Sequence, residues 1–443
     1  LFPYTTLFRS INDADMARHL GQFSVAALPL ELAQIGSRLA DYYISLVGEL
    51  FDGIHSMDTP SDDWAQLGNA FLQFSKETPA EQLEALGISK DEAALFAAAA
   101  FYFGDFPASA CLAMRQSARP SDPQSSWAAC YDFLARPSNL GSQTAIDVQE
   151  HLRSGDLVGL SDKVEASTTA AQNALADGPD VWVAAALLNR LLARFERSNI
   201  RAVLPEGKTA FWTPLINSFI DRKPSTWEFF PSQIQAIERG LLGNAESYSL
   251  QMPTGAGKTT LCETLLYWHL KRNPTHVAIM MVPYRSLASE LRNSLVRQLN
   301  RLGIAARCAY GGTIPSGDEV HGLDHINALI ATPESLSGIL SADPAFAQRI
   351  SLVICDEGHL LDSSGRGIGL ELLLARMKAR LANPIRFVFM SAIIPNIEEI
   401  NAWLGGDENT VIRSTYRPAI AEFSVLRSSG TGVNKSVRLD MHP

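Results

Sequence analysis

The sequence predicts an α/β protein, with a doubly wound parallel sheet preceded by a mostly α-helical domain. From about residue 206, apolar runs rich in Val, Ile and Met alternate with helical patterns. Such alternation, with nearly continuous apolar strands, is typical of a parallel sheet covered by helices on both faces. The first 205 residues show Ala- and Leu-rich helical periodicity instead. A glycine-rich loop also joins a strand to a helix at residues 252–260, as phosphate-binding proteins require.

The sheet domain is expected to alternate short strands with helices. The expected strands cover residues 248–250, 276–282, 305–310, 328–331, 352–355 and 386–390. The expected helices cover residues 259–270, 286–302, 334–340, 367–380 and 397–404. Because ligands of such sheets bind at the carboxyl ends of the strands, we expect the functional site at that edge.

Residues 11–205 are expected to form an α-helical accessory domain. Capping boxes at Ser89-Lys90-Asp91-Glu92 and Thr78-Pro79-Ala80-Glu81 would begin two helices, since the first and last side chains of such a box cap each other's backbone N–H groups. A third helix is expected from residues 177–180 to about Arg197. Its apolar side is predicted to consist of Val181, Leu188, Leu191, Leu192 and Phe195.

Composition excludes several classes of protein. The chain has 443 residues, of which 46% are hydrophobic, so it can bury a large core. No apolar run reaches the roughly 18–20 residues that a membrane helix needs, and no secretory signal is evident. The five cysteines are scattered without a C-x-x-C pair, which argues against a disulfide framework or a zinc site. These features predict a cytoplasmic protein without a membrane partner.

Charge is distributed unevenly along the chain. The formal net charge is −10; residues 1–205 hold 14 Lys+Arg and 25 Asp+Glu, whereas residues 206–443 hold 23 and 22. A negative net charge argues against a protein that binds nucleic acid in general through a basic surface. It leaves room for a local track that binds phosphates.

Both ends of the sequence read as atypical. Residues 1–10 look like a non-native start, and residues 426–443 look like the start of a linker or second domain that is cut short. The sequence is therefore interpreted as a fragment.

Residues 252–260, Met-Pro-Thr-Gly-Ala-Gly-Lys-Thr-Thr, form the candidate phosphate loop. Gly255 and Gly257 would let backbone N–H groups point at phosphate oxygens, near the positive end of the following helix. Lys258 would reach the β- and γ-phosphates, and Thr259 would place its hydroxyl on Mg²⁺. The strict pattern begins with Gly, where this chain has Met252. The expected nucleotide contacts are Pro253, Thr254, Gly255, Ala256, Gly257, Lys258, Thr259 and Thr260.

Two adjacent carboxylates follow the apolar strand at residues 352–355, in Asp356-Glu357-Gly358-His359. Buried carboxylates need a compensating cation or hydrogen bonds. Asp356 would hold Mg²⁺, and Glu357 would orient and deprotonate the attacking water. With Lys258 and His359 they make up the predicted catalytic set.

The glycine loop and Asp-Glu-x-His together resemble the DExH-box helicases of superfamily 2. This resemblance implies a RecA-like ATP-binding domain over residues 206–425, with ATP and Mg²⁺ as cofactors. Residues 229–235 resemble the family's adenine-reading motif; Gln235 would bond the adenine edge, and Phe229 or Phe230 would stack on the base.

Further motifs follow in the family's order. Arg285, the pair Gly311 and Gly312, and Thr332 with Pro333 resemble positions that contact the sugar-phosphate backbone of one strand. Ser391 and Ala392, followed by Ile393 where the family usually has Thr, resemble the motif that couples ATP state to strand movement. Ser391 remains available to hydrogen-bond the acidic motif.

Other segments resemble the superkiller-like branch, which includes helicase subunits of bacterial antiviral systems. They are Gly365-Arg366-Gly367, Ile394-Pro395-Asn396 and Tyr416-Arg417-Pro418. An acidic helical domain ahead of such a helicase suits the helicase subunit of a Hachiman-type antiviral system.

Two functions follow from these resemblances. The first is an ATP-driven helicase that moves 3′ to 5′ on a single strand, with DNA favoured over RNA. The family's arginine-rich second-domain motif is not found before Pro443, so the fragment alone is expected to hydrolyse ATP weakly. The alternative is an ATP-binding switch or scaffold whose helical N-terminal domain docks a partner effector. Retention of Lys258 and Glu357 favours the motor.

Overall fold

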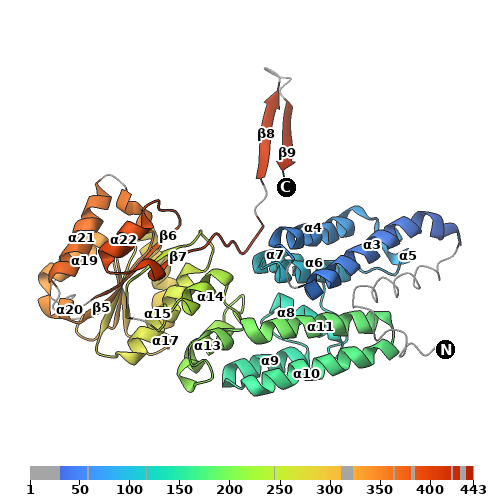
Figure 1. Ribbon diagram of the computed structural model, residues 1–443, viewed down its shortest axis with the longest axis horizontal. Helices are drawn as coiled ribbons and strands as arrows, with labels where there is room; N and C mark the ends of the chain where they lie inside the picture. The colour runs from blue at the N-terminus through green and yellow to red at the C-terminus, as the bar shows by residue number, and fades with distance from the viewer. Residues whose placement is uncertain are drawn as a thin grey trace. The chain divides into compact units, whose positions relative to one another are not determined.

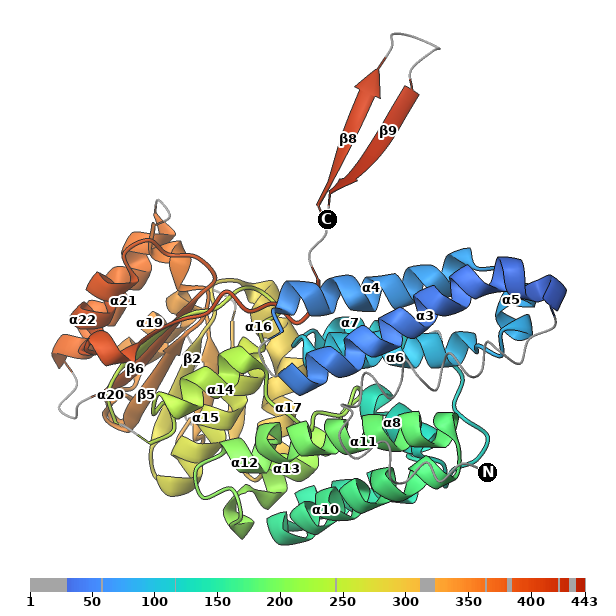
Figure 2. The same ribbon diagram turned by 45° about the vertical axis from the view of Figure 1, so that its right-hand side comes forward.

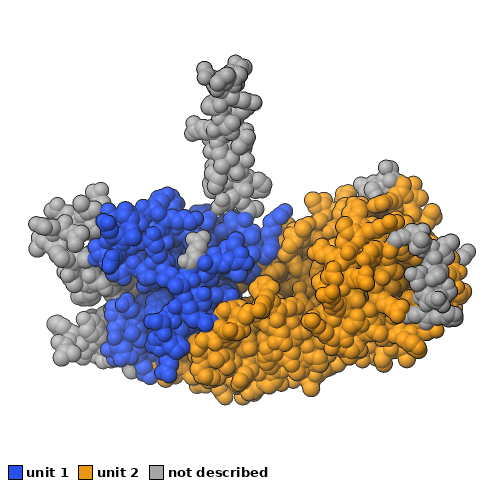
Figure 3. Space-filling view, turned by 180° about the vertical axis from the view of Figure 1, so that it is seen from behind, with its two compact units in different colours: residues 1–135, 170–188, 417–443 blue, residues 136–169, 189–416 orange. Residues whose placement is uncertain are grey.

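The computed structural model describes residues 30–56, 59–115, 117–243, 245–310, 323–362, 365–380, 385–420, 423–429 and 436–442. By internal contacts the chain forms two compact units, residues 1–135 with 170–188 and 417–443, and residues 136–169 with 189–416 (Figure 3). We call them the helical unit and the sheet unit. The boundary near residue 205 that the sequence favours stays a prediction.

The helical unit is built from amphipathic and Ala-rich helices. Its elements are α3 (Leu30–Ser56), α4 (Ser61–Glu77), α5 (Ala80–Ala85), α6 (Lys90–Phe103), α7 (Pro107–Met114), α8 (Ser126–Ala135) and the start of α11 (Pro179–Ser198). Helix α6 is buried on nearly every side, from Ala93 to Tyr102. Its alanines let neighbouring helices approach closely, while rings such as Tyr43 and Phe74 stack at 5.1 Å between centroids. The unit also contains the antiparallel hairpin β8 (Phe423–Ser429) and β9 (Ser436–His442), which was not predicted.

Helix α6 begins as expected, but the cap differs from the prediction. The Ser89 hydroxyl accepts a hydrogen bond from the Asp91 N–H at 3.1 Å. Glu92 does not complete a capping box; its carboxylate accepts from the Tyr43 hydroxyl at 2.6 Å. A buried tyrosine hydroxyl needs a partner, and this tertiary contact takes the glutamate.

Two further predictions about helices were wrong in detail. Thr78 is not a cap, because Pro79 occupies the N-cap position of α5 and no side chain bonds the first turn. Val181 is 46% exposed, whereas Leu191, Leu192 and Phe195 are buried. The predicted apolar stripe of α11 therefore holds beyond its first turn.

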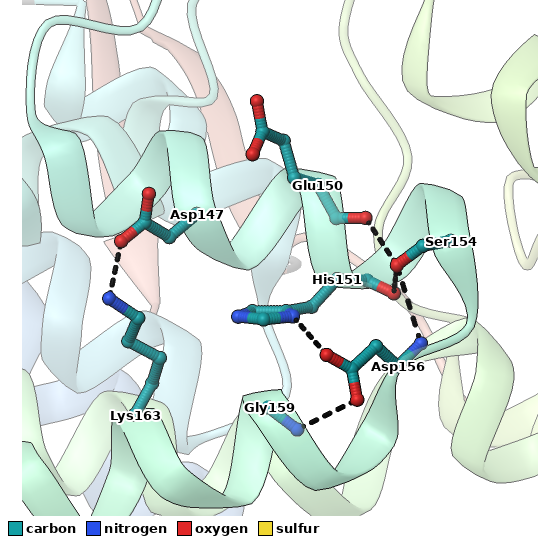
Figure 4. A network of polar contacts seen from close by, with 7 residues as sticks. All are labelled: Asp147, Glu150, His151, Ser154, Asp156, Gly159 and Lys163. Atoms are coloured by element: carbon teal, nitrogen blue, oxygen red, sulfur yellow. Dashed lines mark hydrogen bonds and ion pairs between the residues drawn. The ribbon is translucent and has the colours of Figure 1, made fainter.

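The sheet unit contains a helical hairpin ahead of the sheet. Helices α9 (Gln143–Ser154) and α10 (Leu157–Asn173) meet at Gly155, which has a left-handed φ of 83°. An ion pair between Asp147 and Lys163 joins the two helices, and His151 Nδ1 on α9 lies 3.1 Å from Oδ2 of Asp156 in the turn between them (Figure 4). Asp156 also accepts from the Gly159 N–H at 2.9 Å, which lowers the pKa of its carboxyl.

A parallel sheet of seven strands follows, which confirms the predicted fold class (Figure 1). In spatial order it contains β3 (Ala306–Ala309), β4 (Ala328–Ala331), β2 (Val277–Met281), β5 (Ile350–Cys355), β6 (Arg386–Ser391), β1 (Tyr248–Gln251) and β7 (Val411–Arg413). Strand β7 was not predicted, because three residues are too few to show a pattern.

Of the helices given next, the first three precede β1 and the others connect strands. They are α12 (Ile200–Val203), α13 (Thr213–Ile220), α14 (Pro231–Glu238), α15 (Lys258–Arg272), α16 (Arg285–Leu291), the π-helical turn η3 (Arg292–Val296), α17 (Arg297–Arg301), α19 (Pro333–Ala342), α20 (Pro344–Gln348), α21 (Arg366–Arg380) and α22 (Ile397–Leu404). Short 3₁₀ turns are η1 (Ala174–Ala176), η2 (Ala210–Trp212), η4 (Gly358–Asp362) and η5 (Glu408–Thr410). Among the described residues no helix combines the length and apolarity that a bilayer crossing demands.

The two faces of the sheet are covered by different helices (Figure 2). Alternate strand residues, such as Val277, Ile279 and Met281, form one core with α19, α20, α21 and α22. On the opposite face α15 packs against the sheet, and Cys262 Sγ lies 3.6 Å from Met390 Sδ. Because all seven strands run in the same direction, the loops after β1, β2, β4, β5 and β6 emerge at one edge.

Candidate active site

The loop after β1 takes the conformation that the glycines were predicted to allow. Gly255 and Gly257 both lie in the left-handed region, with φ of 87° and 85°. A Cβ at Gly257 would stand 2.4 Å from the Gln233 amide nitrogen, whereas one at Gly255 would meet no atom within 4 Å. The loop is therefore packed on one side at Gly257 and open at Gly255, which fits a cradle for phosphate.

Lys258 begins α15 and spans the base of this loop. Its ammonium donates to the Met252 carbonyl at 3.2 Å and lies 3.9 Å from Glu357 Oε1. The structure thus brings the predicted phosphate-binding lysine and the predicted general base together from β1 and β5. Among the other loop residues, Ala256 is buried, Thr254 and Thr259 are exposed, and Pro253 and Thr260 are intermediate.

Asp356 and Glu357 occupy the turn after β5. The Asp356 N–H donates to the Met281 carbonyl at 3.0 Å, and Asp356 Oδ1 accepts from the Glu357 N–H at 2.9 Å. Glu357 has a left-handed φ of 52°, and its other carboxylate oxygen lies 3.3 Å from His359 Nδ1. Burial, and secondly the charge of Glu357, raises the pKa of the Asp356 carboxyl. A divalent cation would relieve this cost, so the donor set fits Mg²⁺.

Gln233, which the sequence interpretation passed over, is the glutamine that contacts the loop. Its amide donates to the Gly257 carbonyl at 2.8 Å and accepts from the Phe230 N–H at 2.7 Å. The neighbouring Ser232 hydroxyl donates to the Ala256 carbonyl at 2.9 Å. Gln235 instead lines a hollow of about 560 Å³ with Arg239.

This difference follows from the start of α14. The helix begins at Pro231, so Gln233 is its third residue, from which a glutamine reaches back to the N-cap backbone. Gln235 lies two residues further and projects from another face of the helix. The capping position was the sequence signal that could have identified Gln233.

The two candidate stacking rings have different environments. Phe229 is 3% exposed and meets Phe219 edge-on, with centroids 6.3 Å apart, so it belongs to the core. Phe230 lies beside the loop at Gly257, and its ring centroid is 5.6 Å from that of Tyr416. Of the two, Phe230 is the ring near the phosphate loop.

Ser391 lies where β6 ends, and its side chain bonds within its own segment. Its buried hydroxyl donates to the Ile393 carbonyl at 3.2 Å. Its backbone carbonyl accepts from the Met252 N–H at 2.9 Å, which ties this segment directly to the phosphate loop. Ala392 follows, half-buried, and Ile393 is 76% exposed.

The predicted strand-binding residues lie after β2 and β4. Arg285 is exposed at the start of α16. The Thr332 hydroxyl caps α19 by accepting from the Ser335 N–H at 3.5 Å, and Pro333 is the first helical residue. Gly311 and Gly312 lie outside the described residues.

The order of strands in the sheet separates the predicted nucleic-acid contacts from the predicted nucleotide contacts. Strands β3, β4 and β2 carry the predicted nucleic-acid residues, whereas β6 and β1 carry the coupling segment and the phosphate loop. Strand β5, with Asp356 and Glu357, lies between the two groups.

Comparison with known proteins agrees with this arrangement. The model of the DEAD/DEAH box helicase family matches residues 230–400. The chain is 32% identical over 260 residues to the Hachiman protein HamB of Bacillus cereus, covering 58% of this chain and 23% of HamB. It is 31% identical over 195 residues to the ATP-dependent DNA helicase Hel308 of Methanocaldococcus jannaschii, covering 43% of this chain and 16% of that helicase.

A solved structure of the DEAD-box helicase Mss116, bound to ssRNA and UDP-BeF, is 21% identical with a TM-score of 0.36 and covers 41% of this chain and 39% of that one. The matches to HamB and Hel308 span less than a quarter of either relative's length. The family match thus covers 171 of the 443 residues, and over this part the chain is similar to DEAD/DEAH box helicases.

Proposed function

We propose that this chain binds ATP and Mg²⁺ and couples ATP hydrolysis to 3′-to-5′ movement along a single strand of nucleic acid. The observation that carries the proposal is the approach of Lys258 to Glu357 beside a loop whose glycines leave room for phosphate. A motor needs both groups, whereas the alternative, a switch that only binds nucleotide, has no use for a general base.

In this proposal each residue of the site has a separate role. Lys258 and the loop N–H groups hold the β- and γ-phosphates, while Gln233 and Phe230 recognise the base. Thr259 and Asp356 would hold Mg²⁺, which supplies neutralisation of the charge that develops on the phosphates. Glu357 takes the proton from the attacking water, and His359, 3.3 Å away, orients that carboxylate.

We further propose that the motor serves a Hachiman-type antiviral system in the cytoplasm and acts on DNA. The identity to HamB extends over 260 residues, a longer stretch than residues 230–400. Hel308, a DNA helicase by name, also supports DNA over RNA. Membership of the superkiller-like branch stays part of the proposal and depends on Gly365-Arg366-Gly367 and Tyr416-Arg417-Pro418.

A protein partner on the helical unit belongs to the same proposal. A hollow of about 470 Å³ in that unit is lined by Asp91, Glu92, Asp122 and Trp127, among other residues. Arg119 also lines this hollow, so its guanidinium and the carboxylates together favour a partner segment that carries charges of both signs.

Nucleotide binding is the first step to test, because the structure describes every side chain that is proposed to bind ATP. We expect Lys258→Ala to weaken binding of a fluorescent ATP analogue at least tenfold, measured by anisotropy with Mg²⁺. Lys271→Ala, at the other end of α15, removes the same charge and should change affinity less than twofold. Equal affinities of the two variants would refute the proposed site.

A measurement of ATP hydrolysis distinguishes the proposed motor from the alternative, a switch that only binds nucleotide. Glu357→Gln should keep the affinity for the analogue and lose the strand-stimulated release of phosphate. Because this chain alone is expected to hydrolyse ATP weakly, the comparison is between the two proteins: phosphate release by wild type that Glu357→Gln leaves unchanged would favour the switch.

A further inference from the structure

A large aromatic ring is exposed at the carboxyl end of β2. Tyr284 follows this strand, occupies the N-cap position of α16, and is 45% exposed. Its neighbour Arg285 is the predicted phosphate contact of the same segment. The ring of a half-exposed tyrosine gains free energy when another flat group covers it.

Arg366 brings a second flat group to this ring. Its guanidinium carbon lies 5.9 Å from the centroid of the Tyr284 ring, and its side chain is exposed. Arg366 comes from α21, after the acidic turn, so β2 and β5 supply one partner each. The two groups therefore form an exposed pair at the edge of the sheet where the predicted nucleic-acid contacts lie.

The backbone around Arg366 is closely constrained. Gly365 has a left-handed φ of 83°, and a Cβ at Gly367 would stand 2.3 Å from the Leu361 carbonyl oxygen. Glycine is therefore required on both sides of Arg366. This constraint directs the first turn of α21 and with it the position of the arginine.

The formal charge of this half of the chain is nearly balanced. Residues 206–443 hold 23 Lys+Arg against 22 Asp+Glu. Proteins that bind single strands add aromatic and guanidinium planes on which bases stack, and such stacking tolerates any base. An exposed tyrosine paired with an arginine has this chemistry.

We propose that Tyr284 and Arg366 form a stacking platform for one base of a bound single strand. This inference rests on the proposed function and adds to it a contact with bases, beside the phosphate contacts of Arg285 and Thr332. The platform holds the bound nucleic acid between the loop after β2 and the loop after β5, next to the acidic turn.

The test compares a strand that has bases with one that lacks them. Full-length protein is titrated, at a stated salt concentration, into fluorescent oligothymidylate and into an abasic oligonucleotide of equal length. Tyr284→Leu should bind oligothymidylate about tenfold more weakly, and Tyr284→Phe should bind within twofold of wild type. On the abasic strand all three proteins should bind alike. Tyr42→Leu, a control at a tyrosine that is 49% exposed in the helical unit, should leave both affinities unchanged.

Two more variants distinguish the contribution of base stacking to the affinity from the contribution of charge. Arg366→Lys keeps the charge and loses the flat guanidinium, so it should weaken binding to oligothymidylate and leave the salt dependence unchanged. Arg285→Ala should weaken binding to both strands and reduce the slope of log affinity against log salt by about 1.

Tyr284→Leu that binds oligothymidylate like wild type, or loses affinity equally for both strands, would overturn the platform while leaving the helicase proposal intact. A wild-type protein that binds neither strand would overturn the helicase proposal itself, and the platform with it.

Discussion

Gln233 connects two parts of the candidate site through one side chain. Its carbonyl oxygen accepts from the Phe230 N–H, and its amide nitrogen donates to the Gly257 carbonyl. The residue that would read the base is thus bonded to the loop that would hold the phosphates. Recognition of the base and the shape of the loop are coupled at this residue.

Replacement of this glutamine should therefore damage nucleotide binding. Gln233→Ala leaves two backbone groups without a partner, at a cost of about 1–3 kcal/mol for each group that stays dry. We expect affinity for the ATP analogue to fall about tenfold and the preference for ATP over GTP to shrink, as measured by competition titration. Gln235→Ala is the matched control and should bind within twofold of wild type. The reverse order of effects would restore Gln235 as the adenine reader.

Glu92 gives the helical unit a dependence on pH. Burial raises the pKa of its carboxyl from about 4.5 to about 7, with Asp180 adding to the rise and the Tyr43 hydroxyl opposing it. Between these two values the folded state holds a proton that the unfolded state has released. The free energy of unfolding therefore falls as pH rises from about 4.5 to 7 and stays low above that window.

Glu92→Gln should remove this dependence, because the amide keeps the shape of the carboxyl and does not titrate. We expect urea unfolding, followed by tryptophan fluorescence between pH 5 and 8, to show a flatter profile and a gain of about 1–2 kcal/mol at pH 8. The exposed Glu84→Gln controls for the loss of one charge. Parallel profiles for wild type and Glu92→Gln would show that Glu92 does not cause the dependence.

At the scale of elements, the short helix α12 fixes the α9–α10 hairpin through one buried arginine. The Arg201 guanidinium donates to the carbonyls of Arg153 and Gly207, each at 2.7 Å, and to the Thr213 hydroxyl at 3.0 Å. It is 1% exposed, and burial lowers the pKa of this group. Its planar fork thus ties α9 to the segment that leads into α13.

Arg201→Lys should destabilise the sheet unit although it keeps the charge. An ammonium cannot reach acceptors on both α9 and the later loop, so buried carbonyls lose their donors. We expect a loss of about 2–4 kcal/mol in urea unfolding, with faster proteolysis within residues 143–173. Arg153→Lys breaks a more exposed pair with Asp221 and should cost less than about 1 kcal/mol. Equal costs for the two variants would contradict this role of Arg201.

Elements with strong periodicity were predictable, and elements set by tertiary contacts were not. The strand Ala328–Ala331 and the helix Ile397–Leu404 were predicted to the residue, because apolar runs and helical spacing are local signals. The edge strand β7 and the pairing of Glu92 with Tyr43 depend on distant partners. The glycine loop and the acidic turn were predictable from local sequence motifs, whereas the choice between Gln233 and Gln235 depended on where α14 begins.

At the scale of the whole molecule, the two units give nucleotide a selective effect on stability. The predicted contacts for ATP all lie in residues 189–416, within the sheet unit. A ligand that binds only the folded state stabilises the part that binds it, by about 2.7 kcal/mol at a hundred times its dissociation constant.

Calorimetry should detect this difference. With Mg²⁺ and a non-hydrolysable ATP analogue, we expect the unfolding transition of the sheet unit to move upward by several degrees, while that of the helical unit stays in place. Lys258→Ala should abolish the shift. A shift that survives in Lys258→Ala, or that moves both transitions equally, would contradict a site confined to the sheet unit.

The sheet order also bears on how such a protein can change over evolutionary time. The proposed phosphate and nucleic-acid contacts follow strands of one sheet, whereas Phe230 and Gln233, proposed to recognise the base, precede β1. Substitutions in the loops after β4 and β2, such as one at Tyr284, are therefore expected to change contacts with nucleic acid and to leave the phosphate loop after β1 in place. A change of polymer preference would then need no change of the nucleotide site, because β5 lies between the two groups of loops.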